Sequence, residues 1–354
     1  MQQALATSFL LAAILTAQDP PKTPETRKAN AADLYRLALD DVQRRFGIAS
    51  DDLLALPEAD MDADEPFTAA ECGEAIERAG NALELFAQAA HTPDCHFGPG
   101  REPPATAYDE DCIRLYQLAL LTSARGFRAC DRDPGRAAAD ANTALCFARH
   151  VFAQTSLASA MMGQNSERLG LRLVAAAAAT LQRTADSARI ERCRADLALH
   201  AGARPSLAKL AANEAANALL AVDMVFRERE SPIGGDPNAP VGTFLTANRT
   251  AVRARFAALV DEAMAPLHAD PQPGAAAIGK RAKELAAAWK RDADRQRIER
   301  DFAKLTDEQR TDALAKMFAL LLLPDVGRMA REEEENRALM QRCGEALTLP
   351  AKGR

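Results

Sequence analysis

Apolar residues recur every three or four positions along almost the whole chain, and this period constrains the fold more than any other feature. It is the spacing of one face of an α-helix. In the segment 107–130, for example, Ile113, Tyr116, Leu120 and Ala124 fall on one such face. The sequence contains no run of alternating β-branched residues from which a sheet would be built. We therefore predict an all-α fold.

Capping and turn residues divide this pattern into separate helices. Asp133 followed by Pro134 predicts one helix start, and the capping box Thr306-x-x-Gln309 predicts another. The clearest loop is 231–240. The predicted helices cover residues 30–47, 67–90, 107–130, 134–151, 156–183, 185–201, 206–229, 243–268, 274–304, a segment that begins at Thr306, and 325–346.

Short connections between these helices favour antiparallel pairs that stack in a row. Such stacking gives a tetratricopeptide-like α-solenoid or an irregular helical array. No clean repeat period accompanies the pattern: with Gly126 and Ala138 on the two small positions of a tetratricopeptide repeat, the aromatic position falls on Asn142. We expect a single domain over residues 30–350, which could divide at the loop 231–240.

The first residues are typical of a secretory signal peptide. The run from Ala4 to Ala17 is apolar or small, is too short to span a bilayer, and precedes a proline-rich spacer at 18–29. We expect cleavage of residues 1–17 and export to the periplasm or cell envelope; an apolar first helix packed on the core is the alternative. No later run of uncharged apolar residues is long enough to span a membrane, so we expect no transmembrane segment in the mature chain.

Charge and cysteine content narrow the classes of partner and compartment. A net charge of -6 argues against nucleic acid as a partner. Seven cysteines suit an exported protein if some of them pair, and the odd number leaves at least one unpaired. The geometry of a hairpin between helices 67–90 and 107–130 permits two disulfides, Cys72–Cys130 and Cys95–Cys112.

Several stretches resemble a known group of proteins. These are "NAADLYRLAL", the corner "PDCHF", the long segment "RLYQLALLTSARGFRACDRDPGRAAADANTALCFARHV", and the following "SLASAMMGQNSERLGLRLV". Together they are similar to uncharacterised planctomycete secreted all-helical proteins over residues 30–180, with a looser echo at 320–339. The resemblance implies a helical fold and export, and it implies no particular activity.

The stretch "HTPDCHFGPG", residues 91–100, comes closest to a site for chemistry. His91, Cys95 and His96 carry donor atoms for zinc, and Asp94 could serve as a fourth ligand. However, no Cys-x-x-Cys pair is present, and adjacent Cys95 and His96 would point apart. The prolines favour a stiff corner between two helices, with the metal site as the alternative.

A second candidate metal site lies in "DMDADEPFTAAE", residues 60–71. Five oxygen-bearing residues fall on the ligand positions of an EF-hand calcium loop, namely Asp60, Asp62, Asp64, Thr68 and Glu71. The sixth position, which requires glycine for its turn, is Glu65. An acidic link that favours the N-terminus of the next helix explains the same residues.

No pattern in the sequence indicates a catalytic residue or a cofactor site. A Gly-x-Ser-x-Gly elbow and a glycine-rich phosphate loop are both missing from the sequence. His150 and His200 near helix ends are expected as end-of-helix cations or packed rings, and 332–335 as a solvated acidic face. We therefore expect a scaffold or a protein- or peptide-binding module without catalytic activity; a metal-binding protein or metalloenzyme is the alternative.

Overall fold

The computed structural model describes residues 30–46, 72–95, 110–153, 157–227, 240–269, 272–292, 301–323 and 325–348. Of these residues 87% are helical, and no strand occurs among them. The predicted all-α fold is therefore confirmed. None of the helices in this part of the chain is long and apolar enough to cross a membrane.

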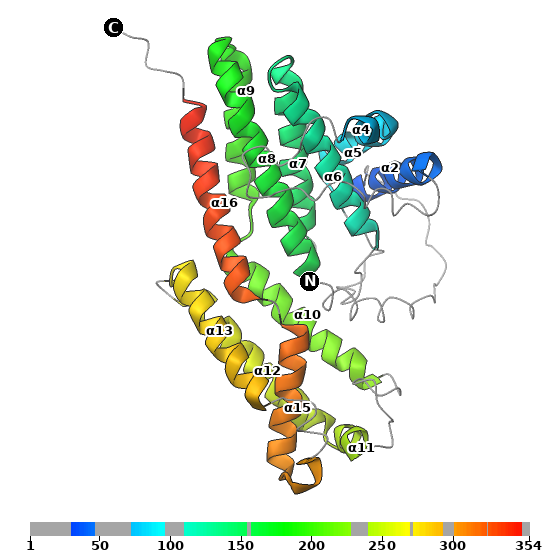
Figure 1. Ribbon diagram of the computed structural model, residues 1–354, viewed down its shortest axis with the longest axis vertical. Helices are drawn as coiled ribbons and strands as arrows, with labels where there is room; N and C mark the ends of the chain where they lie inside the picture. Colours follow the sequence, from blue (N-terminus) through cyan, green and yellow to red (C-terminus); the bar gives the residue numbers. More distant parts are fainter. Residues whose placement is uncertain are drawn as a thin grey trace.

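The helices form two groups along the long axis of the molecule (Figure 1). The N-terminal group consists of α2 (Ala31–Phe46), α4 (Gly73–Arg78), α5 (Gly80–Ala90), α6 (Glu110–Ala129), α7 (Pro134–Phe152), α8 (Leu157–Arg183) and α9 (Ser187–Ala203). The C-terminal group consists of α10 (Leu207–Arg227), α11 (Pro240–Ala247), α12 (Arg249–Met264), η1 (Ala265–Leu267), α13 (Ala275–Asp292), η2 (Phe302–Lys304) and α15 (Asp307–Leu322). The last helix, α16 (Val326–Ala346), extends from the second group back along the first.

Side-chain caps fix where several helices begin. The carboxylate of Asp133 accepts a hydrogen bond from the backbone N–H of Arg136, at 3.0 Å, and Pro134 is the first residue of α7. At α15 the Thr306 hydroxyl accepts from the backbone N–H of Gln309, whose side chain accepts from the backbone N–H of Thr306. Both helix starts were predicted from these residues, and both are confirmed.

Small residues bring α7 and α8 into close contact along most of their length. Ala137, Ala141 and Ala144 of α7 are fully buried. A Cβ atom at Gly170 of α8 would lie 3.1 Å from the carbonyl oxygen of Ala141. These two helices therefore pack almost backbone to backbone and form the centre of the N-terminal group.

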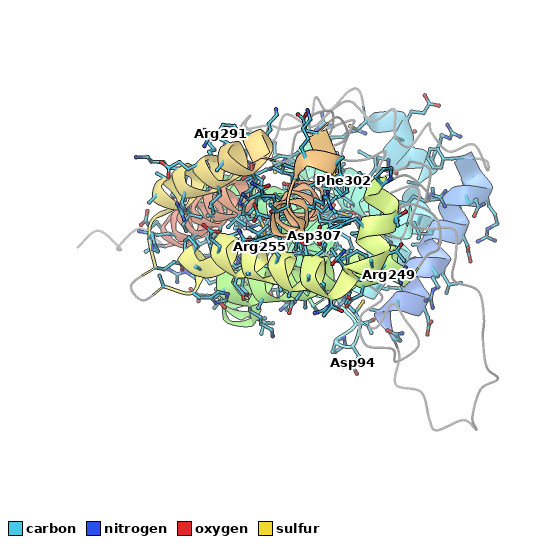
Figure 2. The ribbon with its side chains drawn as sticks, turned by 90° about the horizontal axis from the view of Figure 1, so that it is seen from below. Asp94, Arg249, Arg255, Arg291, Phe302 and Asp307 are labelled. Atoms are coloured by element: carbon cyan, nitrogen blue, oxygen red, sulfur yellow. The ribbon has the colours of Figure 1, made fainter. Side chains whose placement is uncertain are left out.

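Aromatic rings fill the core of the C-terminal group. Phe302 is buried, its ring centroid is 5.6 Å from that of Phe244, and the Arg310 guanidinium lies 5.0 Å from the Phe302 centroid. Figure 2, seen from below, shows Phe302 among the helices of this group. Since Trp289 on α13 is also buried, it belongs to the core, as its position on an apolar stripe predicts.

The packing of α16 differs from the predicted row of stacked pairs. This helix contacts α13, which precedes it closely in the chain, and also α10 and α8; α8 ends more than a hundred residues before α16 begins. In a solenoid each pair contacts only its neighbours in the row. What the described helices show is an all-α assembly closed by its last helix, rather than a simple row.

Candidate functional site

A cleft of about 290 Å³ lies between α7 and α9, beside the C-terminal end of α5. Its lining consists of His91 after α5, Gly135, Ala138, Ala139 and Asn142 on α7, and Arg189, Arg192, Cys193 and Asp196 on α9. Small side chains form the α7 wall, whereas charged side chains and one thiol form the α9 wall. The cleft therefore combines a mostly apolar lining surface with ionic groups from α9.

The two walls have the same residue spacing. The four lining residues of α7 and the four of α9 each follow the pattern i, i+3, i+4 and i+7, which places them on one face of a helix. Both faces come from the N-terminal halves of their helices. Because α8 packs antiparallel to both helices, α7 and α9 run in the same direction, and the two faces meet along their length.

The open end of the cleft carries the guanidinium of Arg189. A Cβ atom at Gly135 would lie 2.8 Å from the Arg189 Cζ atom, so this guanidinium crosses from α9 to the backbone of α7. It also forms an ion pair with Asp186 at 2.9 Å. A larger side chain at position 135 would make this guanidinium move, which a flexible arginine side chain can do.

The inner end of the cleft adjoins a polar cluster around Cys146 of α7. The Arg149 guanidinium donates to the Cys146 sulfur at 2.8 Å, and the Nδ1 atom of His91 lies 3.6 Å from the same sulfur. Burial raises the pKa of the Cys146 thiol, although the charge and hydrogen bond of Arg149 act in the opposite direction. Burial also lowers the pKa of His91. At neutral pH the pair therefore consists of a protonated thiol and a neutral imidazole. A protonated thiol is a poor nucleophile.

The thiols of Cys193, at the cleft, and Cys343, in the core, should react slowly while the chain is folded. The pKa of Cys193 is raised to about 11 by burial and by Asp196, and burial raises that of Cys343 to about 12. Since the thiolate is the reactive form, we expect labelling by 5,5′-dithiobis(2-nitrobenzoate) at pH 8 to be at least roughly 100-fold slower for these two thiols than in urea. Cys193→Ser and Cys343→Ser variants assign the phases, and rapid labelling of Cys343 in the native state would contradict the buried placement.

A buried ionic network fixes the C-terminal half of α9. Glu167 of α8 is completely buried, and its carboxylate accepts from His200 Nε2 at 2.7 Å and from Arg204 Nη2 at 2.7 Å. Arg204 also forms an ion pair with Glu333 of α16. Burial by itself would raise the pKa of Glu167, but the hydrogen bond from His200 and the charge of Arg204 lower it. The network therefore joins α8, α9 and α16 and holds the α9 wall of the cleft in place.

Asn336 extends this network along α16. Its amide donates to the Glu167 carboxylate at 2.8 Å and to the carbonyl oxygen of Gln164 at 2.9 Å, and its own oxygen accepts from Arg168. The sequence suggested a solvated acidic face over 332–335, and this expectation is wrong for Glu332 and Glu333, which are both buried. The reason is tertiary: the guanidinium that compensates Glu333 comes from the end of α9.

His150 and His200, which lie near helix ends, are packed rings. His150 is buried, its Nδ1 atom lies 3.0 Å from the Tyr35 hydroxyl, and burial lowers its pKa to about 4. His200 is buried against Glu167. Of the two expectations for His150, the structure supports the packed ring, because a group with so low a pKa is neutral at pH 7.

The corner after α5 contacts the start of α2, whereas most of the predicted connection to 107–130 lies outside the described residues. The carbonyl oxygen of Asp94 accepts a hydrogen bond from the backbone N–H of Ala31 at 2.8 Å and so anchors the start of α2. The Thr92 hydroxyl donates to the carbonyl oxygen of Gln88. Figure 2 shows the Asp94 side chain pointing away from the helices. The corner positions His91 at the cleft and leaves Asp94 outside it.

The two candidate metal sites are only partly covered by the structure. His91 lies at the cleft, whereas Cys95 is buried in the N-terminal core. Among the described residues, no group of three or more His, Cys, Asp or Glu side chains is placed to hold a metal. His96 and the acidic loop with Asp60, Asp62, Asp64 and Glu71 lie outside the described residues. The calcium loop thus stays a prediction.

The predicted disulfides receive no support from the packing. A Cβ atom at Gly73 would lie 3.1 Å from the Arg128 guanidinium, so the start of α4 lies level with the end of α6, as predicted. However, Cys72 packs in the N-terminal core, while Cys130 packs against the core formed by α7, α8, α9 and α16. The side chain of Cys112 lies outside the described part of the chain, and the Cys95–Cys112 pair stays a prediction.

The residues of the α9 wall were not singled out from the sequence. Arg189, Arg192, Cys193 and Asp196 have the spacing of one helix face, and a search for charged residues at that spacing would have found them. Such faces are usually solvated, so the spacing by itself indicates no site. The charged face of α9 becomes a candidate site only because it packs opposite the stripe of small residues on α7.

Comparisons with known proteins do not assign the chain to a family. No family model matches the chain, and no curated protein or solved structure matches it either. The likeness to planctomycete secreted proteins accordingly stays a prediction, and any functional assignment must come from the site itself.

Proposed function

We propose that the protein is an exported binding module without catalytic activity, and that the cleft between α7 and α9 holds a segment of a protein or a peptide. The observation that carries the proposal is the composition of the cleft, in which the α7 wall of small residues faces the polar α9 wall. Small residues let a peptide backbone approach closely, and guanidinium and amide groups can bind its carbonyl and carboxylate oxygens.

The polar cluster at the inner end supports binding rather than covalent chemistry. A nucleophilic cysteine needs a lowered pKa, and burial raises the pKa of Cys146. Burial lowers the pKa of His91, which makes its imidazole a weaker base. The cluster gives the inner end of the cleft a protonated thiol, a neutral imidazole and the charged guanidinium of Arg149 as hydrogen-bonding groups.

Two finer features belong to the same proposal. Export rests on the apolar run 4–17, which lies outside the described residues. The stacked-helix array, tetratricopeptide-like in its architecture, rests on the consecutive packing of α6, α7, α8 and α9. In such an array the grooves between neighbouring helices generally serve to bind proteins or peptides.

Filling the cleft tests the proposal. Ala139 is exposed and lines the cleft, so Ala139→Trp should occupy the space without disturbing the core. Phage-displayed random peptides selected on the wild-type protein should bind this variant at least about tenfold more weakly, which corresponds to about 1.4 kcal/mol. Binding is measured by biolayer interferometry with synthetic versions of the selected peptides.

The matched control is Ala195→Trp, because Ala195 is an exposed residue of α9 that does not line the cleft. This variant should bind the selected peptides as the wild type does. Equal binding to wild type and Ala139→Trp would show that the cleft is not the peptide site. Turnover of a peptide by the purified protein would refute the absence of catalysis.

A further inference from the structure

The outward face of α13 carries a row of positive charges. Lys280, Lys283 and Lys290 are exposed and follow the spacing i, i+3 and i+10, which places them on one face of the helix. The exposed Arg291 extends the row, and Glu284 is the carboxylate on the same face. We call the four cations the basic stripe. They give this face a net positive charge, although the whole chain has a net charge of -6.

The cations of the basic stripe have no carboxylate partner within the part of the chain that the structure describes. Two exposed cations nearby differ in this respect. Arg255 of α12 lies 2.7 Å from Asp312, and Arg281 of α13 lies 3.1 Å from Glu262. By contrast, no described carboxylate lies within 4.0 Å of a cation of the basic stripe. The described residues therefore leave the charge of the stripe available to a partner.

The neighbouring helix α16 adds a fifth cation. A Cβ atom at Gly279 would lie 3.3 Å from the Arg331 Nη1 atom, so the exposed Arg331 side chain reaches the backbone of α13 one residue before Lys280. Figure 2 shows Arg291, at the other end of the basic stripe, on the outer edge of the C-terminal group. The positive charge is thus accessible from outside along most of α13.

The basic stripe offers charge without an apolar anchor. The large apolar residues of α13, among them Ile278, Leu285 and Trp289, are buried in the core. Ala287 is the small exposed residue between the cations. Stable protein interfaces are centred on buried aromatic or aliphatic side chains, which this face does not offer. An anionic lipid surface requires no such anchor, because it attracts several cations at once.

We propose that the basic stripe docks the protein on an anionic lipid bilayer, whose phosphate groups contact the lysine and arginine side chains. The helix lies on the headgroups without entering the hydrocarbon, because its apolar face is held in the core. The interaction is electrostatic, and it is independent of the cleft between α7 and α9 and of the peptide binding proposed for that cleft.

Co-sedimentation with vesicles tests the proposal. The full-length protein is mixed with phosphatidylcholine vesicles that contain about 30% phosphatidylglycerol, and with vesicles of phosphatidylcholine alone. We expect binding to the anionic vesicles at about 0.1 M salt and its loss at about 0.5 M salt, where the Debye length is shorter. The apolar run 4–17 is present in every variant, and the neutral vesicles measure the binding that it contributes.

Neutralising the basic stripe should weaken binding to the anionic vesicles about 100-fold. The variant carries Lys280→Gln, Lys283→Gln and Lys290→Gln together, and each cation near an anionic bilayer strengthens binding about fivefold. Glu284→Gln should act in the opposite direction and strengthen binding, because it removes the carboxylate on the same face.

The matched control removes the same charge from another part of the molecule. Arg128, Arg132 and Arg192 are exposed cations of the N-terminal group. A variant with Arg128→Gln, Arg132→Gln and Arg192→Gln should change the binding by less than about fivefold, since these residues lie away from the docked face. Circular dichroism and urea unfolding check that both triple variants keep the fold.

The fluorescence of Trp289 separates docking on the surface from insertion. It is the one tryptophan of the chain, and it lies on the buried face of α13. Its emission should therefore stay the same when the vesicles bind. A blue shift on binding would mean that α13 leaves the core and enters the bilayer, which would overturn the proposed docking.

The remaining outcomes are equally decisive. Equal loss of binding in the two triple variants, or equal binding to neutral and anionic vesicles, overturns the proposal. Binding to poly-L-glutamate without binding to anionic vesicles also overturns it, because the basic stripe would then serve an acidic polypeptide. The peptide assay with Ala139→Trp is separate from these measurements, so failure of one proposal leaves the other standing.

Discussion

Replacing Arg204 with alanine should destabilise the fold by about 3–5 kcal/mol, which is a large share of the stability of an ordinary domain. The Arg204 side chain is only 7% exposed and lies between the carboxylates of Glu167 and Glu333. Without the guanidinium, both buried carboxylates lose a charged partner. The free energy of unfolding, measured by urea denaturation followed by circular dichroism, gives the loss.

The control for this prediction is an exposed pair of similar geometry. Arg253 contacts Asp223 at 2.6 Å, but 44% of the Arg253 side chain is exposed. Surface pairs contribute little, so Arg253→Ala should cost less than about 1 kcal/mol. If the two alanine variants lost the same small amount of stability, the network at α8, α9 and α16 would not be buried as the structure has it.

Replacing Gly327 with alanine should also be strongly destabilising, by about 1–3 kcal/mol. A Cβ atom at this position on α16 would lie 2.6 Å from the Cα atom of Gly279 on α13, and 3.3 Å from the Asp325 carboxylate that caps α16. The nearest atom belongs to the backbone of the partner helix, so relief requires the two helices to separate. Thermal and urea unfolding of the variant measure the effect.

Two other glycines provide controls, because their replacement by alanine should either stabilise the protein or destabilise it much less. Gly344 lies on the same helix with no atom within 4 Å of its Cβ position, so Gly344→Ala should stabilise the protein by about 0.5–1 kcal/mol. At Gly279 the closest atom to a Cβ is the tip of the Arg331 side chain at 3.3 Å, which can move. Gly279→Ala should therefore be tolerated far better than Gly327→Ala. Stabilisation by Gly327→Ala would contradict the close crossing of α13 and α16.

The positions of the helices could be predicted well because their signals are local. The predicted helix 156–183 corresponds to α8 at Leu157–Arg183, and 325–346 corresponds to α16 at Val326–Ala346. Capping residues and helical periodicity act within a few residues of the chain. The predicted helix 67–90 differs, because the described part divides at Ala79 into α4 and α5. The predicted helix 243–268 differs as well, because it divides at Asn248 into α11 and α12.

The candidate site could be predicted only in part. His91 was singled out for its donor atoms, but its neighbours at the cleft come from α7 and α9, and the buried sulfur nearest to it belongs to Cys146. The sequence around His91 contains none of these residues. Contacts between residues some fifty positions apart depend on how the helices pack, and a hydrophobic pattern does not specify that packing.

The sequence by itself determined that this chain is helical, where the capped helices begin, and which residues lie on apolar faces, because hydrogen bonds and caps act between near neighbours in the chain. Only the tertiary structure decided that α16 returns to α8, that Glu167 and Glu333 share Arg204, and that α7 and α9 enclose a cleft. The physical reason is that burial and ionic compensation depend on which helix faces which. A helix face with a given sequence lies in solvent when nothing packs opposite it, and it can line a site when another helix does.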